Sequence, residues 1–168
     1  MEYCIFDTAW GSFGFVARGA KLVATFLPAP GREIRRAIEM AYPDAQEHLR
    51  AMPEFRRQVT DYFDGKPVRF TAKVDLSSRT PFHCAALEAC KRIAYGKTSS
   101  YGELARKLGK PAASRAVGGA MARNPLPLVI PCHRVLRSGG ALGGFSSAGG
   151  CGEKERMLEL ETQGLAVR

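Results

Sequence analysis

The amino-acid pattern of this chain changes near residue 78, and this change limits the possible folds more than any other feature. Residues 1–78 contain short apolar runs followed by helical patterns, with 11 Lys and Arg against 10 Asp and Glu. Residues 79–168 are mostly helical in pattern and hold 14 Lys and Arg against 6 Asp and Glu. We therefore expect an α+β protein of two small domains, 1–78 and 79–168, which a chain of 168 residues can accommodate.

The first part is expected to form three strands followed by two helices. Runs rich in Phe, Val, Ile and Tyr, separated by turn residues, predict an antiparallel meander over residues 3–8, 11–18 and 22–26. Helical patterns cover 33–42 and 53–64, and a further strand is expected near 68–74. The second helix carries apolar side chains on one face, which we interpret as core: Phe55, Val59, Tyr62 and Phe63.

The second part is expected to contain short helices. The first starts at Pro81 behind an N-cap at Thr80 and ends at Gly96. Its expected buried residues are Phe82, Ala85, Ala86, Ala89 and Ile93. The next helix covers 101–108, with Ser99 or Ser100 as its cap, and the third covers 113–124, because prolines follow it. Two short helices joined by a tight turn in a basic domain predict a helix-turn-helix.

The outer face of the third helix is almost without side chains. At about 100° per residue, Val117, Ala120 and Met121 point inward. The opposite face holds Arg115, Gly118, Gly119 and Ala122, with Arg123 at its edge. Interior glycines destabilise a helix by about 1 kcal/mol each relative to Ala. Two explanations remain open, close approach to the minor groove of a nucleic acid or tight packing against another helix of the protein.

The apolar segment 128–135 carries a cysteine and a histidine side by side. We expect a strand here, with Cys132 and His133 on opposite faces, so that a bridging water or a local turn would have to connect them. A thiol needs a base to become a nucleophilic thiolate, and His is the usual one. Taken alone, however, the dipeptide is more often a buried Cys beside a structural His. The five cysteines include no CxxC pair, and no ligand spacing supports a zinc site at Cys4 with His48 or His83.

Several motifs occur in a fixed order in the second part. They read SYGELA at 100–105, RAVGGAM at 115–121, NP at 124–125, PCHRV at 131–135 and GGFS at 143–146. In these motifs, over about residues 82–161, the chain resembles the O6-alkylguanine-DNA alkyltransferase family. The resemblance implies a ribonuclease-H-like N-terminal scaffold domain and a mostly helical C-terminal domain with a winged-helix-like helix-turn-helix. It also implies single-turnover alkyl transfer from O6-alkylguanine, flipped out of duplex DNA, to a cysteine of the protein.

The resemblance also assigns roles to individual residues. Cys132 is similar to the alkyl acceptor, His133 to its base acting through water, and Glu161 to the residue that orients the histidine. Further catalytic matches are Asn124, which ties the recognition helix to the active-site segment, and Tyr101, which assists the departing guanine. The implied DNA contacts are Arg115, which fills the stack, Ala116, Gly118, Gly119, Ala122, Arg123 and Ser138. The implied base pocket contains Val135, Phe145, Ser146 and Lys154.

These implications define partners and leave two other functions open. We expect double-stranded DNA containing O6-alkylguanine as partner, a monomer, no cofactor and no metal, and a cytoplasmic protein associated with the nucleoid when bound. No stretch is apolar enough to span a bilayer. Phe145 replaces a common Tyr, Leu87 replaces a common Trp, and the segment around Cys151 is longer than usual in the family. The alternatives are a non-enzymatic flag for damaged DNA and a Cys-His hydrolase built on Cys132, His133 and Glu161.

Overall fold

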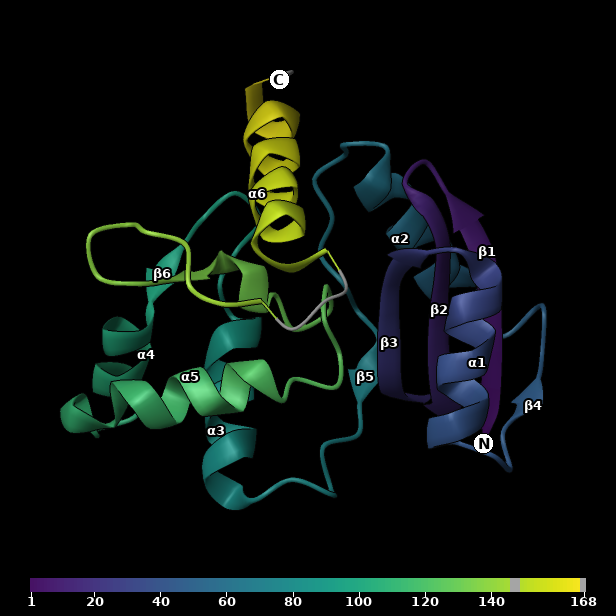
Figure 1. Ribbon diagram of the computed structural model, residues 1–168, viewed down its shortest axis with the longest axis horizontal. Coiled ribbons are helices and arrows are strands. Elements are labelled where there is room, and N and C mark those ends of the chain that lie inside the picture. Colours follow the sequence, from purple (N-terminus) through teal and green to yellow (C-terminus); the bar gives the residue numbers. More distant parts are fainter. Residues whose placement is uncertain (146–148, 167–168) are drawn as a thin grey trace. The chain divides into compact units, whose positions relative to one another are not determined.

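A computed structural model describes residues 1–145 and 149–166 as a mixed α+β protein of two compact units, Met1–Leu76 and Ser77–Arg168. In the first unit, β1 (Glu2–Thr8), β2 (Gly11–Arg18) and β3 (Lys21–Ala29) form an antiparallel meander, as the sequence predicted. Two short edge strands, β4 (Gln46–Glu47) and β5 (Lys73–Val74), pair in parallel with β1 and β3, respectively (Figure 1).

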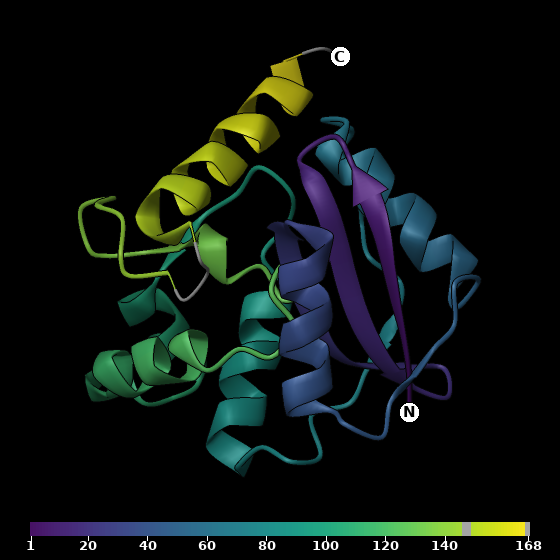
Figure 2. The same cartoon turned by 45° about the vertical axis from the view of Figure 1, so that its right-hand side comes forward.

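Two helices cover opposite faces of this sheet (Figures 1 and 2). Helix α1 (Gly31–Ala41) buries Ile34 and Ile38 against Val16, whereas α2 (Pro53–Phe63) packs the ring of Phe55 on Phe15 from the other side. Side chains of a strand alternate between faces, so each strand of the meander supplies both cores. The expected apolar face of α2 is confirmed, since Phe55, Val59, Tyr62 and Phe63 are all buried.

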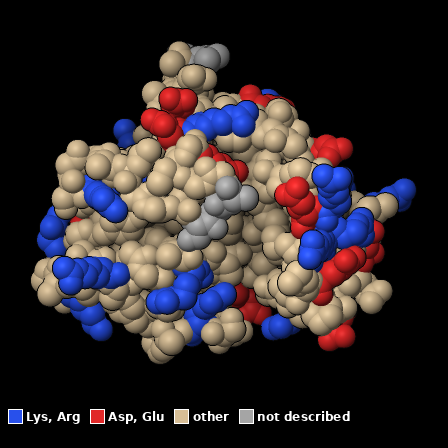
Figure 3. All heavy atoms as spheres, viewed as in Figure 1, with Lys and Arg blue, Asp and Glu red and all other residues tan. Residues whose placement is uncertain are grey.

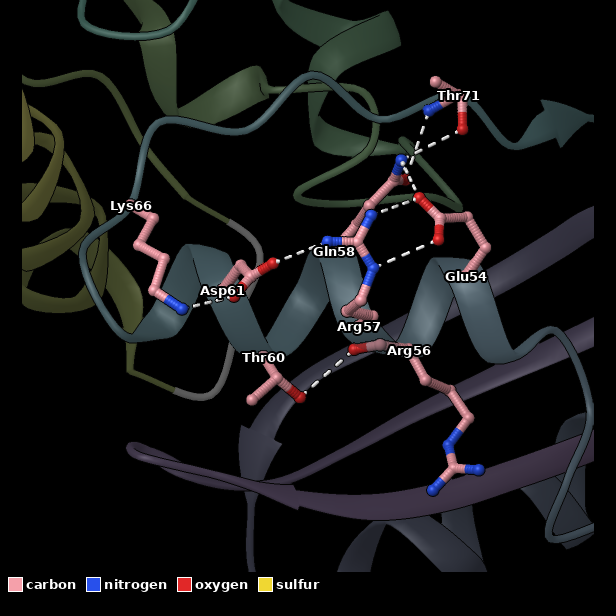
Figure 4. A network of polar contacts seen from close by, with 8 residues as sticks. All are labelled: Glu54, Arg56, Arg57, Gln58, Thr60, Asp61, Lys66 and Thr71. Carbon is pink, nitrogen blue, oxygen red and sulfur yellow. Dashed lines mark hydrogen bonds and ion pairs between the residues drawn. The ribbon is translucent and has the colours of Figure 1, made fainter.

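The segment after α2 forms much less strand than the sequence predicted, because only Lys73–Val74 pairs in the sheet. A side chain of α2 binds this segment instead: Gln58 donates to the Thr71 hydroxyl (3.0 Å), and the Thr71 N–H donates to Gln58 Oε1 (3.3 Å; Figure 4). That N–H is therefore used by a side chain and is not available to a strand ladder. Along the exposed face of α2, ion pairs join Glu54, Arg57, Asp61 and Lys66 (Figure 4).

The second unit is mostly helical. Its elements are α3 (Pro81–Lys91), β6 (Ser99–Ser100), α4 (Tyr101–Lys107), a 3-10 turn η1 (Pro111–Ala113), α5 (Ser114–Ala122), a second 3-10 turn η2 (Cys132–Arg134), β7 (Val135–Leu136) and α6 (Gly150–Ala166). The expected caps are present: Thr80 accepts from the N–H of His83, and Ser100 and Glu103 form a reciprocal capping box. The three predicted helices therefore begin within one residue of their expected positions.

Helix α3 corrects one prediction. It ends at Lys91, before Gly96, and its buried residues are Ala86, Leu87 and Cys90. Of the five residues predicted to be buried, Ala86 and Ile93 are buried, Phe82 and Ala89 are half-buried, and Ala85 is exposed. Small and apolar residues occur on every side of this helix, so the sequence does not define a single buried face. The face that is buried depends on α4 and α5, which both pack against α3.

The segment that carries the Cys-His pair corrects another prediction, because only Val135–Leu136 forms a strand there. This short strand pairs in parallel with β6. Before it, Leu128 has a positive φ of 77°, and Cys132–Arg134 form a 3-10 turn. Prolines at 127 and 131 remove two backbone donors from the segment, which disfavours an extended ladder.

Candidate active site

Cys132 lies at the start of the η2 turn and is 7% exposed. The side-chain amide of Asn124 donates to its Sγ (3.2 Å) and to the carbonyl of Ile130 (2.8 Å), and Asn124 Oδ1 accepts from the N–H of Leu126 (3.0 Å). Burial raises the pKa of the Cys132 thiol, and the Asn124 hydrogen bond lowers it by less. The resting group at neutral pH is therefore the thiol, which must lose a proton before it can act as a nucleophile.

His133 is fully buried, and its Nε2 lies 2.7 Å from Glu161 Oε1. Burial raises the pKa of Glu161, but hydrogen bonds and charges from His133 and Arg134 outweigh this effect and lower it to about 2. An ionised carboxylate only accepts hydrogen bonds, so Nε2 must carry the proton. Burial lowers the pKa of His133, so at neutral pH the imidazole is uncharged. Its Nδ1 then has the lone pair that can accept a proton.

Glu161 has two further partners that sequence reasoning missed. Arg134 donates from Nε to both carboxylate oxygens (3.1 and 3.0 Å) and from Nη2 to Oε1 (2.9 Å), and the N–H of Gly96 donates to Oε2 (2.9 Å). Gly96 has φ +69°, and a Cβ there would clash with Leu165 of α6. Arg134 belongs to the PCHRV motif. Its apolar sequence neighbours were the signal that this charged side chain is buried.

A cavity of about 810 Å³ opens beside Cys132. It is lined by residues of α4, η1, α5 and the segment after β7, among them Tyr101, Arg115, Gly118, Ala122, Arg137, Ser138 and Phe145. The sequence reasoning did not single out Arg137. Ala116, Gly119 and Arg123 belong to α5 or its C-cap but do not line the cavity. Burial raises the pKa of Tyr101, so its hydroxyl keeps its proton and can donate it in a hydrogen bond.

Two residues expected in the base pocket are not among those that line the cavity. Lys154 and Val135 are fully buried, and neither contributes to the cavity wall. The reason is their mutual bond: Lys154 Nζ donates to the Val135 carbonyl (2.6 Å), while Val135 also pairs with β6. Lys154 Nζ lies 5.9 Å from the centre of the Tyr101 ring. Ser146 lies outside the described residues.

The charged surface of the second unit agrees with the uneven distribution of charge in the sequence. Over α4 and α5, the charged side chains visible in Figure 3 are mostly Lys and Arg. The described residues that line the cavity include Arg115 and Arg137 and no Asp or Glu. In the same described part of the chain, no group of His, Cys, Asp and Glu could hold a metal ion, and no helix is long and apolar enough to cross a membrane.

The Cys132 thiol lies at the wall of a cavity whose charged side chains are arginines, and the next residue is a buried imidazole that is hydrogen-bonded to a carboxylate. This arrangement is typical of proteins that use a cysteine nucleophile on an anionic substrate. Comparisons with known proteins define the protein further. The family model "6-O-methylguanine DNA methyltransferase, DNA binding domain" matches residues 81–163. A methylated-DNA–protein-cysteine methyltransferase of Mycobacterium tuberculosis is 38% identical over 130 residues, which cover 75% of this chain and 77% of that protein.

Other relatives agree with this assignment. The Methanosarcina acetivorans protein of the same name is 44% identical over 108 residues, covering 64% of this chain and 67% of that protein. The crystal structure of Mycobacterium tuberculosis OGT in complex with DNA superposes with a TM-score of 0.83 at 31% identity, covering 97% of this chain and 94% of that one. The chain belongs to the methylated-DNA–protein-cysteine methyltransferase family.

Proposed function

We propose that this chain repairs O6-alkylguanine in double-stranded DNA by transferring the alkyl group irreversibly to Cys132. The observation that carries the proposal is the Cys132 thiol at the cavity wall, adjacent in sequence to an imidazole that Glu161 orients. In this proposal the first unit is a ribonuclease-H-like scaffold, and the second, with a winged-helix-like helix-turn-helix at α4 and α5, binds DNA. In the same proposal the protein is cytoplasmic and acts on DNA at the nucleoid.

The transfer is a single displacement at the alkyl carbon. His133 accepts the thiol proton at Nδ1 through a water molecule, and Cys132 Sγ attacks the carbon. A C–S bond forms as the bond between the carbon and guanine O6 breaks. Tyr101 donates a hydrogen bond to the departing guanine anion, which then takes up a proton from water, while His133 releases the thiol proton to solvent. Lys154 and the Asn124 amide stabilise the thiolate, since both lower the thiol pKa. The product is a thioether that no residue of the site can cleave, so each molecule acts once.

The target base must leave the duplex before it can enter the cavity. We infer that α5 approaches the minor groove with its outer face and that Arg115 fills the gap in the stack. The structure weakens the alternative of internal packing: a Cβ on Gly118 would meet only the Tyr101 ring at 3.9 Å, and one on Gly119 would meet the flexible end of Arg123 at 3.1 Å. No neighbouring backbone requires these glycines, which supports close approach of an external partner. Ala116, Gly119, Ala122, Arg123 and Ser138 are assigned to DNA contacts, and Phe145 and Ser146 to the base pocket.

Intact-protein mass spectrometry after incubation with duplex DNA containing O6-methylguanine tests the proposal. We expect a gain of one methyl group per molecule that saturates at one equivalent and maps to Cys132. Cys132→Ala should lose the transfer and keep DNA binding, and Cys151→Ala, which removes an exposed thiol, serves as the matched control. Lesion binding by the parent protein without any mass gain would favour a damage flag. Repeated turnover of an ester or amide substrate would favour the hydrolase.

A further inference from the structure

Arg134 follows the Cys-His pair directly and is 5% exposed. Besides its bonds to Glu161, its Nη1 donates to the carbonyl of Ile93 (2.7 Å), and its guanidinium lies 5.7 Å from the centre of the Tyr95 ring. Arg134 therefore binds both oxygens of the carboxylate that holds the His133 imidazole. Its charge acts on that imidazole as well as on the packing of the turn. We propose that Arg134 is a positioning residue for alkyl transfer, which keeps the His133 imidazole uncharged by neutralising Glu161. This inference rests on the proposed function.

The geometry of Glu161 explains how this works. Its Oε1 accepts from both His133 Nε2 (2.7 Å) and Arg134 Nη2 (2.9 Å), so the imidazole and the guanidinium share one oxygen. A buried carboxylate with no other cation beside it would strongly favour a protonated imidazole. Arg134 supplies a permanent positive charge next to that carboxylate. Protonation of His133 therefore gains less electrostatic stabilisation from Glu161.

The other titratable groups of this cluster do not provide the same effect. Lys154 of α6 also opposes a charge on His133, but its Nζ is bound to the Val135 carbonyl rather than to Glu161. Cys90 of α3 and Tyr95 in the turn after α3 have pKa values raised by burial, so both are uncharged at neutral pH. Cys132 itself rests as a thiol. Arg134 thus places a permanent cation in direct contact with the Glu161 carboxylate.

The consequence for the reaction is a defined working range of pH. Only uncharged His133 can accept the Cys132 proton, so the rate falls on acidification as the imidazole becomes protonated. Without the guanidinium, Glu161 would attract a proton to His133 at a higher pH. The acid limb of the rate profile would then move upward, whereas a purely structural Arg134 would change the rate by the same factor at every pH.

The test compares the full-length parent with Arg134→Gln, Arg134→Lys and Arg106→Gln. The last variant removes the same charge from an exposed position on α4 and is the matched control. Single-turnover methyl transfer from duplex DNA is measured between pH 5 and 9, and the ring nitrogens of His133 are titrated by NMR in each protein. We expect Arg134→Gln to move the acid limb and the His133 titration upward by about one pH unit, which is a tenfold slower rate on that limb. Arg134→Lys and Arg106→Gln should leave the positions of both unchanged.

Each result decides the question. A uniform loss of rate in Arg134→Gln with an unmoved His133 titration would overturn the proposal. If Arg134→Gln does not fold, the parent and Arg134→Lys still test it: His133 of the parent must titrate below the ordinary histidine value of about 6.5, and the lysine variant must not shift it. A parent that transfers no methyl group at any pH would refute the proposed function alone, because the NMR titration reports on Arg134 independently of transfer.

Discussion

Replacing Glu161 by Gln should remove a pH-dependent part of the stability of the second unit. The carboxylate is 1% exposed and accepts hydrogen bonds from His133, Arg134 and the backbone of Gly96. Its pKa falls from 4.5 to about 2, because the bonds and charges of His133 and Arg134 outweigh the burial that raises it. Folding therefore favours the ionised form of this side chain.

The size of the effect follows from this shift. A decrease from 4.5 to about 2 corresponds to about 3 kcal/mol of folding free energy above pH 4.5, and it is lost as the pH falls from 4.5 toward 2. His133 contributes a further loss of folding stability as the pH falls. Burial lowers its pKa, so below pH 6.5 the unfolded chain takes up a proton that the folded protein does not. Acid should therefore begin to destabilise the protein below pH 6.5 and do so more steeply below 4.5.

Urea unfolding of the parent, Glu161→Gln and Glu159→Gln between pH 2 and 8 measures this effect. Glu159 is exposed on the same helix, so its variant controls for the loss of one negative charge on α6. We expect Glu161→Gln to be less stable than the parent by roughly 3 kcal/mol at pH 7, because Arg134 stays buried without its carboxylate. The difference should shrink toward zero near pH 2. A difference that stays constant across this pH range would refute the reasoning, since it would show that the charge of Glu161 does not contribute.

Four further predictions concern single residues. Asn124→Ala should slow methyl transfer at least tenfold, measured in a single turnover, because the thiolate loses its amide donor. Arg115→Ala should slow repair of duplex DNA and leave a single-stranded substrate unaffected, and equal slowing of both would contradict its role in the stack. Gly118→Ala should stabilise the free protein by about 1 kcal/mol in urea unfolding and weaken DNA binding. Gln58→Ala should cost about 1–2 kcal/mol of stability through the loss of its bonds to Thr71, with an unchanged transfer rate.

The sequence was most informative where local interactions decide the structure. The meander is encoded in short apolar runs between turn residues, and the helix starts at Pro81 and Tyr101 depend on caps only one to three residues away. The sequence was least informative where distant residues decide. The strand expected over 68–74 depends on Gln58, which binds the Thr71 backbone from another element. The buried face of α3 likewise depends on the helices that pack against it.

The candidate site shows the same division. Motif resemblance brought forward Cys132, His133, Asn124 and Glu161, and the structure describes hydrogen bonds that connect Asn124 to Cys132 and Glu161 to His133. The resemblance did not assign a role to Arg134, because its importance comes from a carboxylate 27 positions away in the sequence. Nor does the sequence predict a 3-10 turn at these residues, since their apolar, β-branched neighbours are typical of a strand.

This turn explains how three consecutive residues can serve three different purposes. In an extended strand, Cys132 and Arg134 would point to the same face and His133 to the other. In a 3-10 turn, successive side chains point in directions about 120° apart. The thiol can then face the cavity while the imidazole and the guanidinium both reach Glu161. The buried Arg134 cation requires an anion beside it, and the same Glu161 carboxylate binds the His133 imidazole. Helix α6 must therefore pack against the turn before the thiol has its proposed base.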